Sequence, residues 1–139
     1  MATRATYSFQ STGKPNITLY IHHDGYEAGA GHYIAQAFAE GGEDRNDYFT
    51  VESFIKANDR AEITGSHEAH GDTEYRYDFI ATAPHGTFNL DSTVIVSKRV
   101  GFWGSAARWS ETLFTVREFL LDYGHAPTVQ AIEAEEYAV

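Results

Sequence analysis

The chain has 139 residues, 42% hydrophobic and 14% aromatic, which is enough to bury the core of one globular domain. Ten basic residues against twenty acidic ones give a net charge of −10, which disfavours direct binding to nucleic acid or to anionic lipid. The absence of cysteine excludes disulfides, thiolate ligands and thiol nucleophiles, and it favours a cytoplasmic location. No apolar run approaches the roughly 20 residues that cross a membrane.

The first part of the chain predicts a β-hairpin followed by two helices. Strict alternation over residues 3–10 and a β-branched, aromatic run over residues 17–21 predict two strands with a Gly-Pro turn between them. Residues 29–42 carry apolar side chains at helical spacing and end in two glycines. Residues 50–58 predict a second, short helix with Thr50 as its N-cap.

The second part predicts strands and then one strong helix. Short strands are expected at residues 60–66, 73–81 and 92–100, and the second of these alternates tyrosine and phenylalanine with charged residues. Ser110 is expected to cap a helix over residues 111–124, where leucine and phenylalanine repeat at helical spacing.

The order of these elements predicts the fold class. Strands and helices do not alternate regularly, and the chain has no internal repeat and no linker. We therefore expect residues 1–139 to form a single compact α+β domain, with an antiparallel sheet packed against two or three helices. Residues 126–139 are expected to form either a short helix or a frayed tail. An exposed edge strand would support a homodimer.

Polar side chains crowd the first strand-to-helix turn, within the stretch IHHDGYEAGAGHY (21–33). Asp24 and Gly25 favour a positive φ angle, and Asp24 can accept from the first amides of the helix. The same amides attract an anion when they are free. His22, Asp24, Gly25 and Tyr26 are therefore candidates either for a structural cap or for a ligand-binding turn.

A second polar loop, SHEAHGD (66–72), lies between two predicted strands. If the two loops meet on one rim of the sheet, His67, His70 and Asp72 converge with the first turn and form a pocket. Such nitrogen and oxygen ligands suit a divalent metal, although HEAH lacks the spacing of the zinc-peptidase motif. The alternative is that these are solvated loop residues, with no metal or other cofactor.

Two arginines offer a further way to bind an anion. Arg4 and Arg76 are expected on one face of paired strands, where their guanidinium groups could clamp a carboxylate or a phosphate. The alternative is that they pair with Glu74 and Asp78. Tyr75 could stack on a bound base, or it could belong to the core.

Three aromatic side chains follow the last predicted strand, in a glycine-flanked stretch that we expect to be irregular. Phe102, Trp103 and Trp109 could anchor a protein partner, or they could fill the space under the final helix. The chain has no serine in a nucleophile-elbow motif, so we nominate no catalytic residue.

Three stretches, TRATYSF (3–9), YIHHDGYEAGAGHYI (20–34) and SHEAHGDTEYRYDF (66–79), resemble a family of small proteins of bacteriophages and bacterial genomes. Its members typically carry a Thr-Arg-Ala strand, a His-aromatic-Asp-Gly-Tyr-Pro motif and a His-Gly-Asp-x-Glu-Tyr strand. Here His23 replaces the usual aromatic residue and Glu27 the usual proline. The resemblance implies a phage or mobile-element origin, and with it the cytoplasm of a host cell.

These observations lead to three functional hypotheses. The first is an acidic, phage-type, non-enzymatic binding protein that inhibits a host defence complex, such as a nucleic-acid-binding effector, through a basic surface of the host protein. The second is a binding protein, or sponge, for a small anionic molecule such as a nucleotide messenger. The third, and least favoured, is a metal-dependent hydrolase built on the histidine loops.

Overall fold

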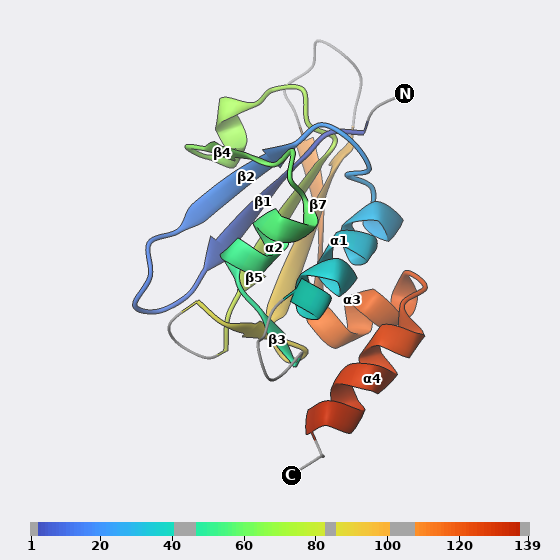
Figure 1. The fold of residues 1–139 in the computed structure, drawn as a ribbon. Helices are drawn as coiled ribbons and strands as arrows, with labels where there is room; N and C mark the ends of the chain where they lie inside the picture. Colours follow the sequence, from blue (N-terminus) through green and yellow to red (C-terminus); the bar gives the residue numbers. More distant parts are fainter. Residues whose placement is uncertain (1–2, 41–46, 83–85, 101–107, 137–139) are drawn as a thin grey trace.

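A mixed β-sheet with helices on one face forms the frame of the molecule (Figure 1). The computed structural model describes residues 3–40, 47–82, 86–100 and 108–136. Within these ranges the chain forms a six-stranded sheet, a two-stranded sheet and four α-helices, which confirms the α+β prediction. None of the helices in the described ranges has the length and hydropathy that a membrane-spanning segment requires.

The large sheet has one parallel pair at its centre. Its strands, in order across the sheet, are β4 (Glu62–Thr64), β2 (Ile17–Ile21), β1 (Ala5–Gln10), β5 (Tyr75–Ile80), β7 (Thr93–Val100) and β8 (Arg108–Thr115). All neighbours are antiparallel except β1 and β5. The prediction of an antiparallel sheet is wrong for this pair, because the chain crosses from edge strand β4 over β2 and β1 before it enters β5.

The helices pack on one face of this sheet. They are α1 (Glu27–Glu40), α2 (Val51–Ala57), α3 (Val116–Asp122) and α4 (Ala126–Glu136), with a short 3-10 turn, η1 (His67–Ala69), in the β4–β5 crossover. Figure 1 shows α1, α2 and α3 in front of the sheet and α4 outside α3. The small sheet pairs β3 (Tyr48–Phe49) with β6 (Phe88–Asn89). The C-terminal segment is thus a helix over most of its length.

Aromatic rings fill the space between the sheet and the helices. Tyr7 stacks on Tyr77 with ring centroids 4.8 Å apart, and Phe9 stacks on Phe79 at 5.0 Å. Phe54 of α2 packs on both β1 rings. These five side chains are at most 2% exposed. The alternation predicted for β1 and β5 therefore places their aromatic residues in the core.

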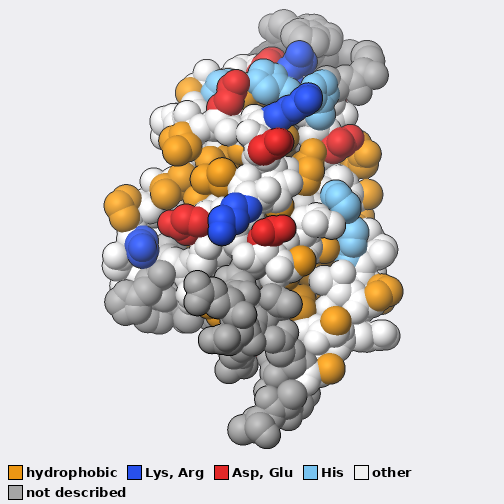
Figure 2. Space-filling model, viewed as in Figure 1, with side chains coloured by type: hydrophobic (Ala, Val, Ile, Leu, Met, Phe, Trp, Pro, Cys, Tyr) orange, Lys and Arg blue, Asp and Glu red, His pale blue; other side chains and the backbone are white. Residues whose placement is uncertain are grey.

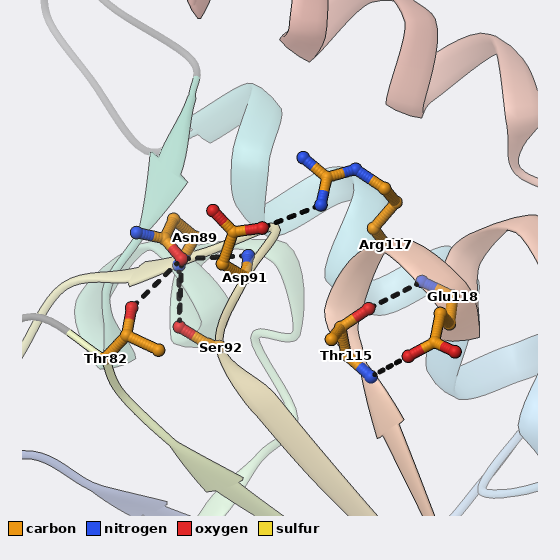
Figure 3. A network of polar contacts seen from close by, with 7 residues as sticks. All are labelled: Thr82, Asn89, Asp91, Ser92, Thr115, Arg117 and Glu118. Carbon is orange, nitrogen blue, oxygen red and sulfur yellow. Dashed lines mark hydrogen bonds and ion pairs between the residues drawn. The ribbon is translucent and has the colours of Figure 1, made fainter.

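Two capping boxes mark the starts of α2 and α3. Thr50 caps α2, as predicted, and Ser53 completes the box. Thr115, not Ser110, caps α3, where the Thr115 N–H donates to Glu118 at 2.9 Å (Figure 3). This hydrogen bond lowers the pKa of the Glu118 carboxyl.

The helix predicted over residues 111–124 is therefore wrong in its first part. Residues 108–115 form β8, which pairs with β7 at eight successive positions. The ladder of backbone hydrogen bonds to β7 outweighs the local helical spacing of leucine and phenylalanine. At the junction, Arg117 donates to Asp91 at 2.7 Å and ties the start of α3 to the turn before β7 (Figure 3).

Candidate functional site

A cavity of about 710 Å³ opens at the rim of the sheet where β2 ends. Its walls are His22 and His23 after β2, Tyr33 of α1, residues 57–62 between α2 and β4, and Arg4 before β1. We call it the rim cavity. Its volume lies within the range of about 300–1,000 Å³ that is usual for small-molecule sites. Figure 2 shows histidine, basic (Lys or Arg) and acidic side chains gathered at the upper end of the face in view.

The end of α2 is shaped by one asparagine. The Asn58 side-chain amide donates to the carbonyl of Phe54 at 3.1 Å, and its backbone N–H donates to that of Ile55 at 3.0 Å. The Asn58 carbonyl then accepts from the N–H of Ala61 at 2.9 Å. These bonds turn the chain from α2 towards β4, and the turn brings Arg60 to the cavity wall.

Carboxylates pair with two of the cavity's basic side chains. The Arg4 Nε lies 3.3 Å from Asp72 Oδ2, and the His22 Nε2 lies 3.5 Å from Glu62 Oε2. Asp72 also accepts from the hydroxyl of Tyr20 at 2.7 Å. Burial, and then this hydrogen bond, raise the pKa of Tyr20 to about 12.

Tyr20 joins the two polar loops. Its ring stacks on His70 with centroids 3.8 Å apart, and it meets the edge of His22 at 4.5 Å. The His70 Nε2 lies 2.8 Å from the Thr64 hydroxyl oxygen. Four of the candidate residues, Arg4, His22, His70 and Asp72, thus lie together at this rim.

Three other candidates belong to the β2–α1 turn itself. Asp24 has a φ angle of 57°, and its carboxylate accepts from the Tyr26 hydroxyl at 3.3 Å. A Cβ atom at Gly25 would lie 2.6 Å from that of Ala5, so this close approach requires glycine. The Gly25 carbonyl accepts from Tyr77 at 2.6 Å, which ties the turn to the core.

The remaining two candidates lie on opposite faces of the sheet. Tyr75 is on the core face and 6% exposed, and burial, followed by a hydrogen bond to Glu27, raises its pKa. His67 lies on the other face, with Nδ1 2.6 Å from the Thr6 hydroxyl and Nε2 2.9 Å from Asp78 Oδ1. Because a carboxylate only accepts, Nε2 donates to Asp78.

The Thr6–His67–Asp78 chain has the residue types of a nucleophile, a base and an orienting carboxylate. However, Thr6 is 0% exposed, so its hydroxyl cannot reach a substrate. The chain instead holds the β4–β5 crossover onto β1 and β5.

The geometry does not support the metal site. In the described part of the chain, no three histidine, aspartate or glutamate side chains form a group that could hold a metal ion. His67, His70 and Asp72 each contact other side chains instead: Thr6 and Asp78, Thr64, and Arg4.

Arg76 does not join Arg4 in a clamp. Its guanidinium carbon lies 4.1 Å from the centre of the Trp109 ring, and its Nη1 lies 3.7 Å from Glu68 Oε1. Trp109 belongs to β8 and pairs with Arg99, so the prediction that it lies in an irregular stretch is wrong. Phe102 and Trp103 lie outside the described residues.

Three walls of the rim cavity, Tyr33, Asn58 and Arg60, were not among the residues predicted from the sequence. Comparisons with protein-family profiles, with curated proteins and with solved structures find no match to the chain.

Proposed function

We propose that this protein is a non-enzymatic binding protein and that the rim cavity holds a small anionic ligand. One observation carries the proposal: a chain with a net charge of −10 gathers two arginines and two histidines, beside the carboxylates of Asp59 and Glu62, around one cavity of about 710 Å³. Arginine recognises carboxylates and phosphates through several parallel N–H donors. The flat rings of Tyr33 and His23 suit an unsaturated ligand such as a nucleotide.

Mass spectrometry under native conditions, on protein purified from its own host, tests this proposal first. We expect a retained small molecule with negative charge. Arg60→Ala should weaken binding of that molecule by about tenfold, because a charged hydrogen bond is lost. Arg108→Ala, which removes the same charge from an exposed position on β8, should leave binding unchanged. Equal loss in both variants would refute a local role for the cavity.

A second candidate function rests on the net charge of −10. In this proposal the protein acts as a phage-type inhibitor and covers a basic surface of a host defence protein that normally holds nucleic acid. Trp109 and the exposed Leu113 of β8, with Phe102 and Trp103 nearby in sequence, are the proposed contacts. The resemblance to phage proteins agrees with this role only by association, because small acidic proteins of phages often inhibit host defence.

Affinity purification from the native host tests the second candidate. We expect a basic host protein that dissociates as salt is raised and that is released by competing nucleic acid. A partner that stays bound at high salt, or that competing nucleic acid does not release, would contradict this electrostatic inhibition.

The expected homodimer stays a prediction. Strand β8 forms an edge of the sheet over eight residues, where a second copy of the chain could pair, and light scattering can measure the oligomeric state.

A further inference from the structure

Two basic groups of the rim cavity, Arg4 and His22, already lie against carboxylates of the chain. Asp72 lies against Arg4 at 3.3 Å and Glu62 lies against His22 at 3.5 Å. Asp59 and Glu62 also line the cavity beside Arg60. The wall carries two arginines and the carboxylates of Asp59 and Glu62, and Asp72 adds a third carboxylate beside Arg4. An incoming anion must therefore compete with carboxylates of the chain itself.

This competition disfavours a simple carboxylate ligand. An internal carboxylate is held beside its partner at a high effective concentration, which a free ligand of equal charge cannot match. A ligand with two or more negative charges gains more Coulomb energy from the same arginines. It also has enough oxygens to contact Arg4 and Arg60 together.

Asp72 is also well placed to leave Arg4. Its Oδ2 accepts from the Tyr20 hydroxyl at 2.7 Å, so the carboxylate keeps a hydrogen bond when the arginine turns to a ligand. Its side chain is 48% exposed, and that of Arg4 is 41% exposed, so water can solvate both groups during the exchange.

We infer that the rim cavity selects ligands with a phosphate-type dianion over monocarboxylates, and that Asp72 sets their affinity by competing for Arg4. The inference rests on the proposed small-ligand function and adds the ligand class and the residue that limits its binding. Removing the charge of Asp72, which lies against the wall residue Arg4, should therefore strengthen ligand binding.

Asp72→Asn is the decisive variant. The asparagine oxygen can still accept from the Tyr20 hydroxyl, but the negative charge that Asp72 placed beside Arg4 is gone. Because exposed ion pairs contribute little, we expect pyrophosphate to bind about two- to fivefold more tightly. Glu111→Gln on β8 is the matched control, since it removes one exposed negative charge far along the sheet from the cavity. Glu62→Gln is a second variant and should act in the same direction, because it removes a negative charge from the cavity wall.

Isothermal titration of wild type and these variants with pyrophosphate and with acetate tests the inference, with thermal midpoints as a check on folding. Tighter pyrophosphate binding by Asp72→Asn, with Glu111→Gln unchanged and acetate weak throughout, supports it. If wild type binds pyrophosphate but Asp72→Asn and Glu62→Gln bind no better than Glu111→Gln, or if acetate binds equally well, the inference is overturned and the proposed function stands. If no variant binds either probe, the proposed function fails as well.

Discussion

The two faces of the large sheet are built from the same strands but are held in different ways. On one face Tyr7, Tyr77 and Phe79 stack in a dry layer under the helices and are 0% exposed. On the other face β1 and β5 carry the polar residues Thr6, Ser8, Arg76 and Asp78, and His67 binds Thr6 and Asp78. The aromatic face gains its stability from apolar burial, whereas the polar face depends on satisfied hydrogen bonds.

This difference separates stability from function. The crossover held by His67 continues to His70 and Asp72, which reach the rim cavity through Tyr20 and Arg4. Substitutions on the aromatic face should therefore lower the free energy of unfolding most. Substitutions on the polar face should instead shift the position of the β4–β5 crossover.

The largest effect is expected on the aromatic face. Phe79→Ala removes a ring that is 0% exposed and leaves a cavity among other rings. The free energy of unfolding should fall by about 3–5 kcal/mol. Chemical denaturation measures this, with Ile80→Ala, the next residue and 39% exposed, as the control. A loss no greater than that of Ile80→Ala would contradict a core held by aromatic packing.

A smaller loss is expected on the polar face. His67→Ala leaves Thr6 and Asp78 without the imidazole between them, which should cost about 1–3 kcal/mol. His32→Ala, at an exposed position on α1, should cost less than about 0.5 kcal/mol. A double-mutant cycle with Asp78→Asn measures the coupling directly. Additive effects in that cycle would show that the histidine does not bind the carboxylate.

Tyr20, on the polar face, should also make the stability of the fold depend on pH in alkali. The pKa of Tyr20 is raised to about 12, so the fold favours its protonated form. Its contribution to stability is complete below the ordinary tyrosine pKa of about 10 and is lost as the pH rises through about 12. Wild type should lose stability more steeply than Tyr20→Phe over this interval.

Urea unfolding at a series of pH values measures that difference. Tyr75 and Tyr77, whose pKa values burial also raises, are present in both proteins, so the comparison isolates Tyr20. Parallel curves for the two proteins would mean that neither burial nor the hydrogen bond to Asp72 raises the pKa of Tyr20 in solution.

The smallest effect concerns the hydroxyl groups of Tyr7 and Tyr77, whose rings stack on each other. The Tyr7 hydroxyl is buried and has no hydrogen-bond partner among the described residues, whereas Tyr77 donates to the Gly25 carbonyl at 2.6 Å. Tyr77→Phe should lose about 1 kcal/mol, and Tyr7→Phe should be neutral or slightly stabilising. Thermal unfolding of the two variants side by side checks this. Equal losses of stability in the two variants would mean that the Tyr7 hydroxyl also makes a hydrogen bond.

Much of the fold could be predicted because local signals agreed with long-range packing. Alternation in β5 and the Thr50 cap of α2 are examples, since both patterns describe the final environment. The start of α3 could not be predicted, because Leu113 and Phe114 fit a helix locally and only pairing with β7 makes them a strand. The parallel β1–β5 pair and the two-residue strands of the small sheet likewise depend on distant partners.

The candidate site was predictable to a similar degree. Arg4, His22 and Asp72 were visible as polar residues near strand ends, where loops meet at a rim. Arg60 was not, because only the turn made by Asn58 brings the end of α2 to that rim. His67 does not line the rim cavity, because its ring binds Thr6 and Asp78 instead.

The central claim, that the rim cavity binds phosphate-type anions, is tested most directly by nuclear magnetic resonance. In a titration of isotope-labelled protein with pyrophosphate, the account predicts saturable shifts of the backbone amides of residues 21–23 and 57–62, with those of β8 unmoved. Saturating pyrophosphate that leaves the cavity amides in place, or that shifts only amides elsewhere, would contradict it.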